Sequence, residues 1–290
     1  IEGKSDEPHE ALPPITPRDK IIVAFAGPLF SFSLAILFAV VVWLIGRPVS
    51  ESDTTTVIGF VKRGSPAEKA GLKTGDRILR VDGHKVDRFS GVGDTVIWRV
   101  VSSTGDTIPI EVEREGQRMT FETAYTREET KFWERKSLRQ IQISPKKTPL
   151  VGRVEPNSPA ALAGIRANDI LREANGIRLW SPEALADIIE QAGEGTDIRL
   201  KIQRGKETLE TTVRAEYPVY PPDFPKEDRR PLIGVVWEST GLWTVDHPGP
   251  MEQVVSSVNA MVSTFGALFS PKSDVKAHHL SGFVGIMRIY

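Results

Sequence analysis

One nine-residue pattern occurs twice in the chain, at positions about 93 residues apart. Residues 64–72 read Gly-Ser-Pro-Ala-Glu-Lys-Ala-Gly-Leu, and residues 157–165 read Asn-Ser-Pro-Ala-Ala-Leu-Ala-Gly-Ile. Each copy leads to an aspartate that opens a short apolar run, Asp76 or Asp169, and then to an Asp-Gly or Asn-Gly dipeptide. A repeat of this length indicates that much of the chain is one small module used twice.

The residues of each copy predict a small unit of strands with one short and one longer helix. Serine followed by proline starts the short helix, because the hydroxyl caps its N-terminus and proline suits the first turn. The Asp-Gly and Asn-Gly dipeptides favour tight turns between strands. The longer helix is predicted at residues 89–101 in the first copy. In the second copy Ser181 caps it, and Leu185 and Ile189 share its apolar face.

This order of elements, with the Ser-Pro-Ala-x-x-Ala-Gly pattern present twice, closely resembles the PDZ domain in its permuted bacterial form. The resemblance implies an α+β fold with modules at residues 55–146 and 148–239, each a small β-barrel or sandwich with two helices. It also implies that an extended peptide adds to an open strand edge beside the longer helix, while backbone N–H groups hold a carboxylate. The implied peptide-binding strands are residues 138–144 and 232–238.

The loops at these strands depart from the family pattern of apolar, glycine, apolar. Gln142 stands at the glycine position of the first loop, whereas the second loop keeps Gly234 in a register that stays open by two residues. The residues assigned to peptide binding are Ile141, Gln142, Ile143, Ile233, Gly234, Val235, Leu185 and Ile189. The alternative is that the strands only complete a sheet and that the grooves act as a spacer or steric gate.

Composition sets limits on the remaining residues. The 290 residues are 40% hydrophobic and 26% charged, which leaves room for two modules and a further segment. A net charge of −1 gives no reason to expect nucleic acid as a partner. The sequence has no cysteine, so disulfides and thiolate chemistry are excluded within it.

Residues 21–45 form an uncharged, largely apolar run. At about 1.5 Å per residue it is long enough to cross a hydrocarbon core of about 30 Å. We therefore predict a membrane-approach segment at 1–19 and a transmembrane helix at 20–46. A buried soluble helix and a signal peptide are the alternatives, but a signal peptide has an apolar region of only about 7–15 residues. The flanking charges favour a cytoplasmic N-terminus, with the modules on the periplasmic or extracytoplasmic side.

Gly27 and Pro28 interrupt this apolar run. Together they free a backbone carbonyl, which hydrocarbon tolerates only where protein or polar groups satisfy it. Ser31, one turn further along, is the predicted polar partner. The alternative is an ordinary kink with a small-residue packing face.

The chain contains, in order, a membrane helix with Ala-Gly-Pro-x-x-Ser, two PDZ modules, an amphipathic stretch and Leu280-Ser281-Gly282. This order resembles the site-2 protease family, most closely its bacterial RseP-type members. These are zinc intramembrane metalloproteases with inserted PDZ domains. The resemblance implies that Gly27, Pro28 and Ser31 position the substrate backbone. It also implies that a helix at 250–270 lies at the membrane surface or along the membrane-embedded core, and that 271–290 lead into the next membrane segment. Packing of that helix on the second module is the alternative.

The zinc-binding motif of that family, His-Glu-x-x-His, is missing from the sequence. His9-Glu10 is followed by Pro13 where the second histidine should stand, and His278-His279 are adjacent and diverge on a helix. We therefore assign no catalytic and no metal-binding residue. By resemblance the protein uses Zn²⁺ with ligands outside these residues, so the chain is expected to be the central portion of a longer protease.

The resemblance implies regulated intramembrane proteolysis in the bacterial inner (cytoplasmic) membrane by a multi-pass protein. Its expected partners are the membrane and single-pass membrane protein substrates, cleaved within the bilayer after a site-1-type protease has trimmed them. The PDZ tandem is then a substrate size filter or peptide-binding gate. The alternative is a non-catalytic, membrane-tethered tandem PDZ protein that binds peptides or acts as a scaffold. A PDZ-bearing serine protease of the HtrA type is disfavoured, because its protease domain precedes the modules without a membrane helix between.

Overall fold

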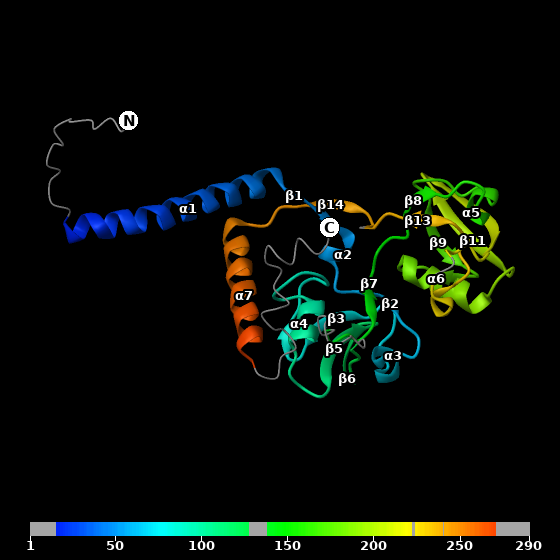
Figure 1. Cartoon of the computed structure of the whole chain (residues 1–290), viewed down its shortest axis with the longest axis horizontal. Helices are drawn as coiled ribbons and strands as arrows, with labels where there is room; N and C mark the ends of the chain where they lie inside the picture. Colours follow the sequence, from blue (N-terminus) through cyan, green and yellow to red (C-terminus); the bar gives the residue numbers. More distant parts are fainter. Residues whose placement is uncertain (1–15, 128–137, 222–223, 240, 271–290) are drawn as a thin grey trace, which may run out of the picture. The chain divides into compact units, whose positions relative to one another are not determined.

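The computed structural model describes residues 16–127, 138–221, 224–239 and 241–270 (Figure 1). It divides into two compact units. One contains the N-terminal helix and the segment His247–Val254, and the other contains both repeats and the rest of the C-terminal helix. The predictions made for His9-Glu10, His278-His279 and Leu280-Ser281-Gly282 lie outside the described residues, as do those for 271–290 and most of 1–19.

Helix α1 extends over Pro17–Ile45 and begins three residues before its predicted start. Thr16 caps it: its hydroxyl accepts from the N–H of Asp19, and its own N–H donates to the Asp19 carboxylate at 2.9 Å. Its 29 residues extend about 43 Å. Within the described part of the chain, α1 is the one helix that is long and apolar enough to cross a membrane.

The first module contains two antiparallel sheets and two short helices (Figure 1). One sheet has the strand order β4-β3-β5-β6, and the other pairs β2 with β7. The elements are β2 (Ile58–Val61), α3 (Pro66–Ala70), β3 (Arg77–Val81), β4 (His84–Lys85), α4 (Val96–Ser102), β5 (Ile108–Arg114), β6 (Gln117–Thr123) and β7 (Ile143–Pro145). Side chains from both sheets and from α4 meet in one hydrophobic core.

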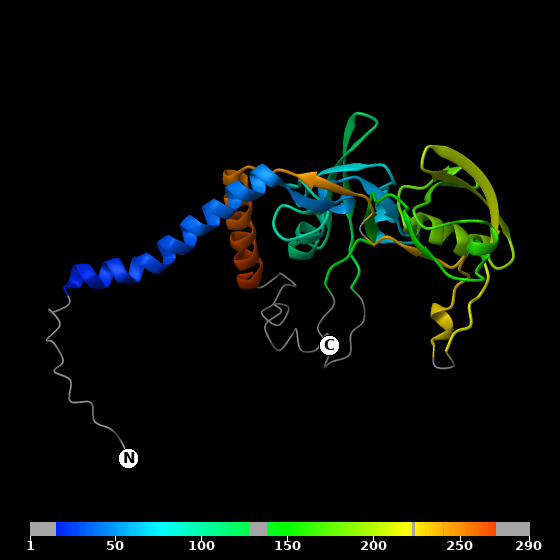
Figure 2. The same cartoon turned by 90° about the horizontal axis from the view of Figure 1, so that it is seen from above.

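The second module repeats this topology with the sheet orders β10-β9-β11-β12 and β13-β8. Strands β11 and β12 form the long curved hairpin drawn in yellow-green in Figure 2. The elements are β8 (Val151–Val154), α5 (Pro159–Leu162), β9 (Ile170–Ala174), β10 (Ile177–Arg178), α6 (Pro182–Ala192), β11 (Asp197–Arg204), β12 (Glu207–Arg214), the 3-10 helix η1 (Lys226–Asp228) and β13 (Val235–Trp237). The module has its own hydrophobic core. The α+β fold with two similar modules is confirmed.

Helix α4 is shorter than the helix predicted at 89–101. Gly91 and Gly93 adopt φ angles of +111° and +99°, which are incompatible with a helix, and Thr95 then caps α4 by accepting from the N–H of Trp98. Val92 therefore lies in a loop instead of on the helix. The spacing of valines at 92, 96 and 100 resembled a longer helix because helical periodicity continued across these glycines.

The two repeated aspartates form the same buried ion pair in each module. Asp76, 1% exposed, contacts Arg114 through Nε–Oδ1 at 2.6 Å and Nη2–Oδ2 at 2.8 Å. Asp169, 0% exposed, contacts Arg204 through the same atoms at 2.8 Å each. Each carboxylate also accepts from the backbone N–H three residues earlier, and each arginine donates to the glycine carbonyl that follows the short helix. The pair therefore ties that helix, its following loop and the central strand together.

Helix α7 (Pro250–Phe269) packs against α4 of the first module through small residues in its C-terminal half. The indole Nε1 of Trp98 donates to the Ser263 hydroxyl at 2.6 Å, and Ala267 is buried with Val101 in a small apolar cluster. The apolar stripe predicted from the sequence lies mostly on its exposed side, where Phe265 is 58% exposed. The described contacts of this half are thus with the first module and not with the second, the alternative considered from the sequence.

The linking segments contain one further short helix and a strand pair. Helix α2 covers Glu51–Thr54, and β1 (Arg47–Ser50) pairs with β14 (Trp243–Asp246).

Candidate peptide-binding site

The two loops predicted to bind peptide have the same backbone conformation. Gln142 has a φ angle of +62° and Gly234 one of +78°. Their carbonyls accept from equivalent N–H groups, that of Lys62 at 3.1 Å in the first module and that of Glu155 at 2.9 Å in the second. This equivalence aligns Gln142 with Gly234. Gly234, and not a residue two positions away, therefore occupies the glycine position of the family pattern in the second loop.

Only the second loop demands glycine on steric grounds. A Cβ at Gly234 would lie 2.2 Å from Cβ and 2.6 Å from Oγ of Ser158, the residue that caps α5. In the first module a full side chain occupies this position, where Gln142 is half-buried. The two loops therefore share a backbone conformation but present different surfaces to a ligand.

Both loops offer backbone N–H groups to a ligand. Among the residues that the structure describes, the N–H groups of Ile141, Gln142, Ile233 and Gly234 have no hydrogen-bond acceptor. The side chains of Ile141 and Ile233 are buried in the cores of their modules, at 3% and 4% exposed. These residues can therefore contribute backbone dipoles, but not side chains, to the capture of a peptide carboxylate or carbonyl.

The strands next to these loops are shorter than predicted. Strand β7 begins at Ile143, because Gln140 instead forms a bridge with Thr126 through two backbone hydrogen bonds of 2.8 and 3.0 Å. In the second module Leu232 forms the matching bridge with Glu216. Each bridge uses the backbone N–H and C=O of the bridged residue, so these two groups cannot pair with an added strand.

A cavity of about 320 Å³ lies between α4 and residues 138–143 of the first module, and we call it the groove. Its lining is mostly apolar: Phe89, Val96, Ile97, Val100, Val101, Leu138, Arg139, Gln140, Ile141, Gln142 and Ile143. Ile97 is 46% exposed, so it is the α4 side chain most open to a ligand. The groove has the position and the apolar character that peptide binding beside the longer helix requires.

The longer helix of the second module presents a different surface. Leu185 and Ile189, assigned to peptide binding from the sequence, are 0% and 5% exposed and belong to the core of the module. The sequence signal marked an apolar helix face correctly but could not tell a core-facing from a groove-facing stripe. The accessible side chains of α6 include Glu183, Asp187 and Glu190.

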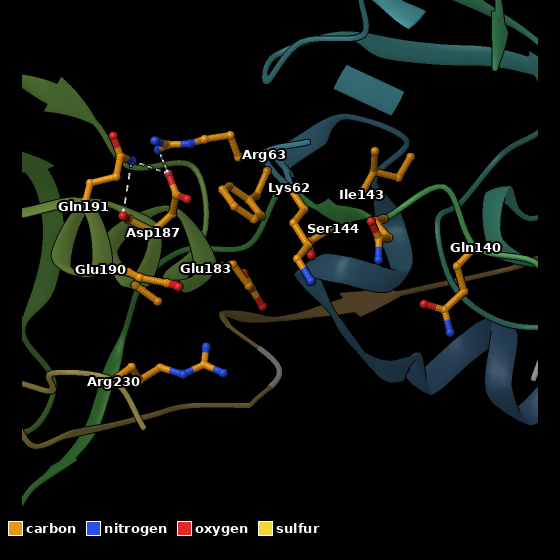
Figure 3. Close-up of a pocket in the computed structure, with 13 residues that line it drawn as sticks. Lys62, Arg63, Gln140, Ile143, Ser144, Glu183, Asp187, Glu190, Gln191 and Arg230 are labelled. Carbon is orange, nitrogen blue, oxygen red and sulfur yellow. Dashed lines mark hydrogen bonds and ion pairs between the residues drawn. The ribbon is translucent and has the colours of Figure 1, made fainter. Parts of the chain in front are cut away.

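These α6 side chains line a second, larger cavity of about 640 Å³, shown in Figure 3, which we call the cleft. The opposite wall consists of residues from β2, β7 and their flanking loops in the first module. The full lining is Phe60, Lys62, Arg63, Gln140, Gln142, Ile143, Ser144, Glu183, Ala186, Asp187, Glu190, Gln191 and Arg230. The cleft is thus more polar and more strongly charged than the groove.

Ion pairs neutralise some of the charges in the cleft. Arg63 contacts Asp187 at 2.8 Å, and Gln191 donates to the same carboxylate at 2.6 Å (Figure 3). Glu183 contacts Lys147 at 3.5 Å. Sequence reasoning missed all of these residues, because the contact between Arg63 and Asp187 joins positions 124 residues apart.

The positions predicted to guide a substrate backbone lie in α1. Pro28 is inside the helix and lacks the N–H that would bond residue 24, while a Cβ at Gly27 would meet no atom within 4 Å. A hydroxyl that bonds the backbone nearby is that of Ser33, which donates to the carbonyl of Leu29 at 2.9 Å. A substrate-positioning role for Gly27, Pro28 and Ser31 stays a prediction.

The part of the chain that the structure describes has no set of side chains that fits a zinc ion. Within it no group of three or more His, Cys, Asp or Glu side chains could hold a metal ion.

Comparison with known families agrees with this geometry. Sequence models of the PDZ domain match residues 44–124 and 150–204. The chain contains two PDZ domains. The first PDZ match includes Asp76 and Arg114, and the second includes Asp169 and ends at Arg204, so both include the repeated ion pair.

Curated relatives carry the names of proteases. "Putative zinc metalloprotease NMA0084" of Neisseria meningitidis is 28% identical over 222 residues, which cover 76% of this chain and 46% of the relative. "Regulator of sigma E protease" of Haemophilus influenzae is 27% identical over 65% of this chain and 41% of its own length. "Putative zinc metalloprotease mll0638" of Mesorhizobium japonicum is 42% identical over 33% of this chain and 24% of its own length.

These relatives confirm the resemblance to site-2-type zinc metalloproteases that the motifs indicated. In each case the matched region spans less than half of the relative's length. The chain is therefore similar to a portion of these relatives.

Proposed function

We propose that this chain is the PDZ-bearing part of an intramembrane zinc metalloprotease that cleaves single-pass membrane proteins within the bilayer. The observation that carries the proposal is the similarity to a relative named as a zinc metalloprotease over 76% of the chain. The apolar helix α1, with nearly all its large side chains exposed, supports a place in the membrane. In this proposal α1 spans the bacterial inner membrane and the PDZ tandem lies on its extracytoplasmic side.

The PDZ tandem is proposed to select substrates that a site-1-type protease has already shortened. Two cavities support this role, the apolar groove of the first module and the charged cleft lined by both modules. A folded outer domain is much larger than either cavity, whereas an extended peptide fits both. The tandem thus excludes bulk and binds chain segments with the same surfaces.

Zinc belongs to the proposal only through the relatives' names. Because the described residues offer no donor set for it, we place its ligands outside them. Gly27, Pro28 and Ser31 are proposed to position the substrate backbone near that site.

The test uses the intact protein encoded by the gene, purified in detergent, and two membrane substrates that differ only in the presence of a folded outer domain. We expect bound zinc and cleavage of the trimmed substrate alone. Deletion of residues 55–238 should preserve cleavage of the trimmed substrate and permit cleavage of the intact one. If the deletion variant loses activity on trimmed substrate and gains none on intact substrate, the filter role is wrong. A zinc-free protein that cleaves neither substrate would favour the non-catalytic, membrane-tethered alternative.

A further inference from the structure

We propose that the first module binds an internal segment of its partner, in which apolar residues are followed by an acidic side chain. The apolar residues occupy the groove, and Lys62 and Arg230 hold the acidic side chain in the cleft beyond it. This proposal rests on the proposed function only in taking the groove as a peptide site, and it does not depend on proteolysis.

The groove and the cleft meet at one stretch of backbone. Gln140, Gln142 and Ile143 line both cavities. A peptide chain that leaves the groove past this stretch therefore enters the cleft directly. The cleft, at about 640 Å³, lies within the range of roughly 300–1,000 Å³ found for sites of drug-sized ligands, far larger than one carboxylate needs.

The charges left without partners in the cleft favour an acidic ligand. Asp187 is paired with Arg63, and Glu183 with Lys147. In the part of the chain that the structure describes, no ion pair involves Lys62, Arg230 or Glu190, all of which line the cleft. Two cations thus face one anion, and an added carboxylate gains charge-assisted hydrogen bonds.

The backbone of both cationic residues, Lys62 and Arg230, is held in place by hydrogen bonds. The N–H of Lys62 donates to the carbonyl of Gln142 at 3.1 Å, directly at the loop where groove and cleft meet. Tyr220 brackets Arg230, because its hydroxyl donates to the Arg230 carbonyl at 2.7 Å and accepts from the Arg230 N–H at 3.1 Å. A fixed backbone lowers the cost of ordering the ligand contacts.

The loop itself favours a chain that continues over one that ends. Gln142 carries a half-buried side chain where the second module has glycine, so the first loop departs from the apolar, glycine, apolar pattern that the PDZ resemblance associates with holding a carboxylate. A passing peptide bond needs only single hydrogen bonds there, and its downstream side chains have the space of the cleft. Capture of a free C-terminus is therefore an outcome of the test and not the proposal.

The experiment measures binding of fluorescent peptides to the full chain in detergent, by anisotropy. The internal acidic probe has an apolar run, two glutamates and a neutral tail with an amidated end. A second probe replaces the glutamates by lysines, and a third ends in a free carboxylate directly after the apolar run. We expect the acidic probe to bind about tenfold more tightly than the lysine probe, as expected for gain of charge-assisted contacts, and at least as tightly as the free-carboxylate probe.

Variants separate the two parts of the site. Lys62→Glu combined with Arg230→Glu should remove the preference for glutamates over lysines. Lys85→Glu combined with Lys206→Glu, two exposed residues outside both cavities, changes the net charge equally and should retain that preference. Ile97→Glu should weaken all three probes, whereas Leu162→Glu, at a side chain 81% exposed on α5, should not.

Three results would overturn the proposal. Tighter binding of the free-carboxylate probe indicates capture of a C-terminus. Equal loss of the glutamate preference in both double variants indicates a general charge effect. No effect of Ile97→Glu shows that the groove is not the peptide site, and this outcome leaves the protease and size-filter functions open, since those are tested by cleavage.

Discussion

Asp169 shows why the repeat retains an aspartate at the end of its motif. Burial opposes ionisation of its carboxyl group, but the hydrogen bond from Arg204 and the N–H of Arg166 hold its pKa below the ordinary value. The same side-chain hydrogen bond raises the pKa of Arg204. The charged pair is therefore the stable form of this site at neutral pH.

Replacing Asp169 by Asn should destabilise the second module by roughly 3 kcal/mol, the low end for breaking a buried ion pair, since Arg204 is partly exposed. Arg204 then keeps its charge without its buried partner. Urea unfolding, followed by hydrogen exchange in β9 and β11, measures the loss. Asp197→Asn is the matched control, because its carboxylate pairs with Arg214 at the surface and is 53% exposed. An equal loss in both variants would contradict the role of burial.

The stability of the second module should also depend on pH through Asp169. Because its folded-state pKa lies below the unfolded value of about 3.9, the contribution is present above that value and is lost as pH falls through the folded pKa. The difference in unfolding free energy between the native chain and Asp169→Asn should thus be constant near neutrality and shrink below about pH 4. A difference that stayed constant into strong acid would argue against the ion pair.

Gly234→Ala should destabilise the second module by about 1–3 kcal/mol more than Gly193→Ala, because only the first change overpacks its surroundings. Both glycines have positive φ, +78° and +75°, so both variants introduce backbone strain. A Cβ at Gly193 meets no atom within 4 Å, whereas one at Gly234 collides with Ser158. The midpoints of thermal unfolding of the two variants test this difference. Equal midpoints would show that the loop at Gly234 accommodates a Cβ without loss of stability.

Most local structure could be predicted from the sequence, whereas the distant partners could not. The turn dipeptides at 82–83 and 175–176 have the positive φ angles that their residue types favour. The serine caps of the short helices are also present, whereas Ser181 at the N-cap of α6 makes no side-chain capping hydrogen bond. The arginine partners of Asp76 and Asp169 lie 38 and 35 residues away, so no local pattern indicates them.

At the scale of elements, periodicity identified helix faces but not what they face. The apolar stripe of α6 is part of the core, because it packs with residues of the four-stranded sheet of its module. The apolar stripe of α7 proved to be mostly exposed, while small residues make its contacts. Apolar spacing alone cannot separate these cases, since both have a 3.6-residue period.

Ala267→Arg should detach the C-terminal half of α7 from α4, because a long charged side chain cannot fit where Ala267 is 6% exposed. We expect faster hydrogen exchange in residues 255–269. We also expect the fluorescence of Trp98 to change, because its indole loses the hydrogen bond to Ser263. Phe265→Arg, on the exposed side of the same helix, should change neither signal. If both variants behave alike, the packing of α7 on α4 is wrong.

At the scale of the whole chain, the order of elements was predictable and the cleft was not. The repeat, the apolar run and the amphipathic stretch are each continuous in sequence, so each can be recognised by itself. The cleft instead depends on Arg63, Asp187 and Arg230, which come from three separate segments. The charge pattern of any one segment therefore does not predict that residues from the three segments line one cleft.

The two modules should unfold as separate units, because each has its own core and the ion pair that joins them is weak. Arg63 is 53% exposed, and exposed pairs contribute about 0.2–1 kcal/mol. Asp76→Asn should therefore accelerate hydrogen exchange in β3, β5 and β6, while β9 and β11 keep their native rates. Arg63→Ala should leave the exchange of both cores unchanged. If Asp76→Asn also accelerated exchange in β9 and β11, the cleft would have to be a rigid interface, and ligands entering it would then act on both modules together.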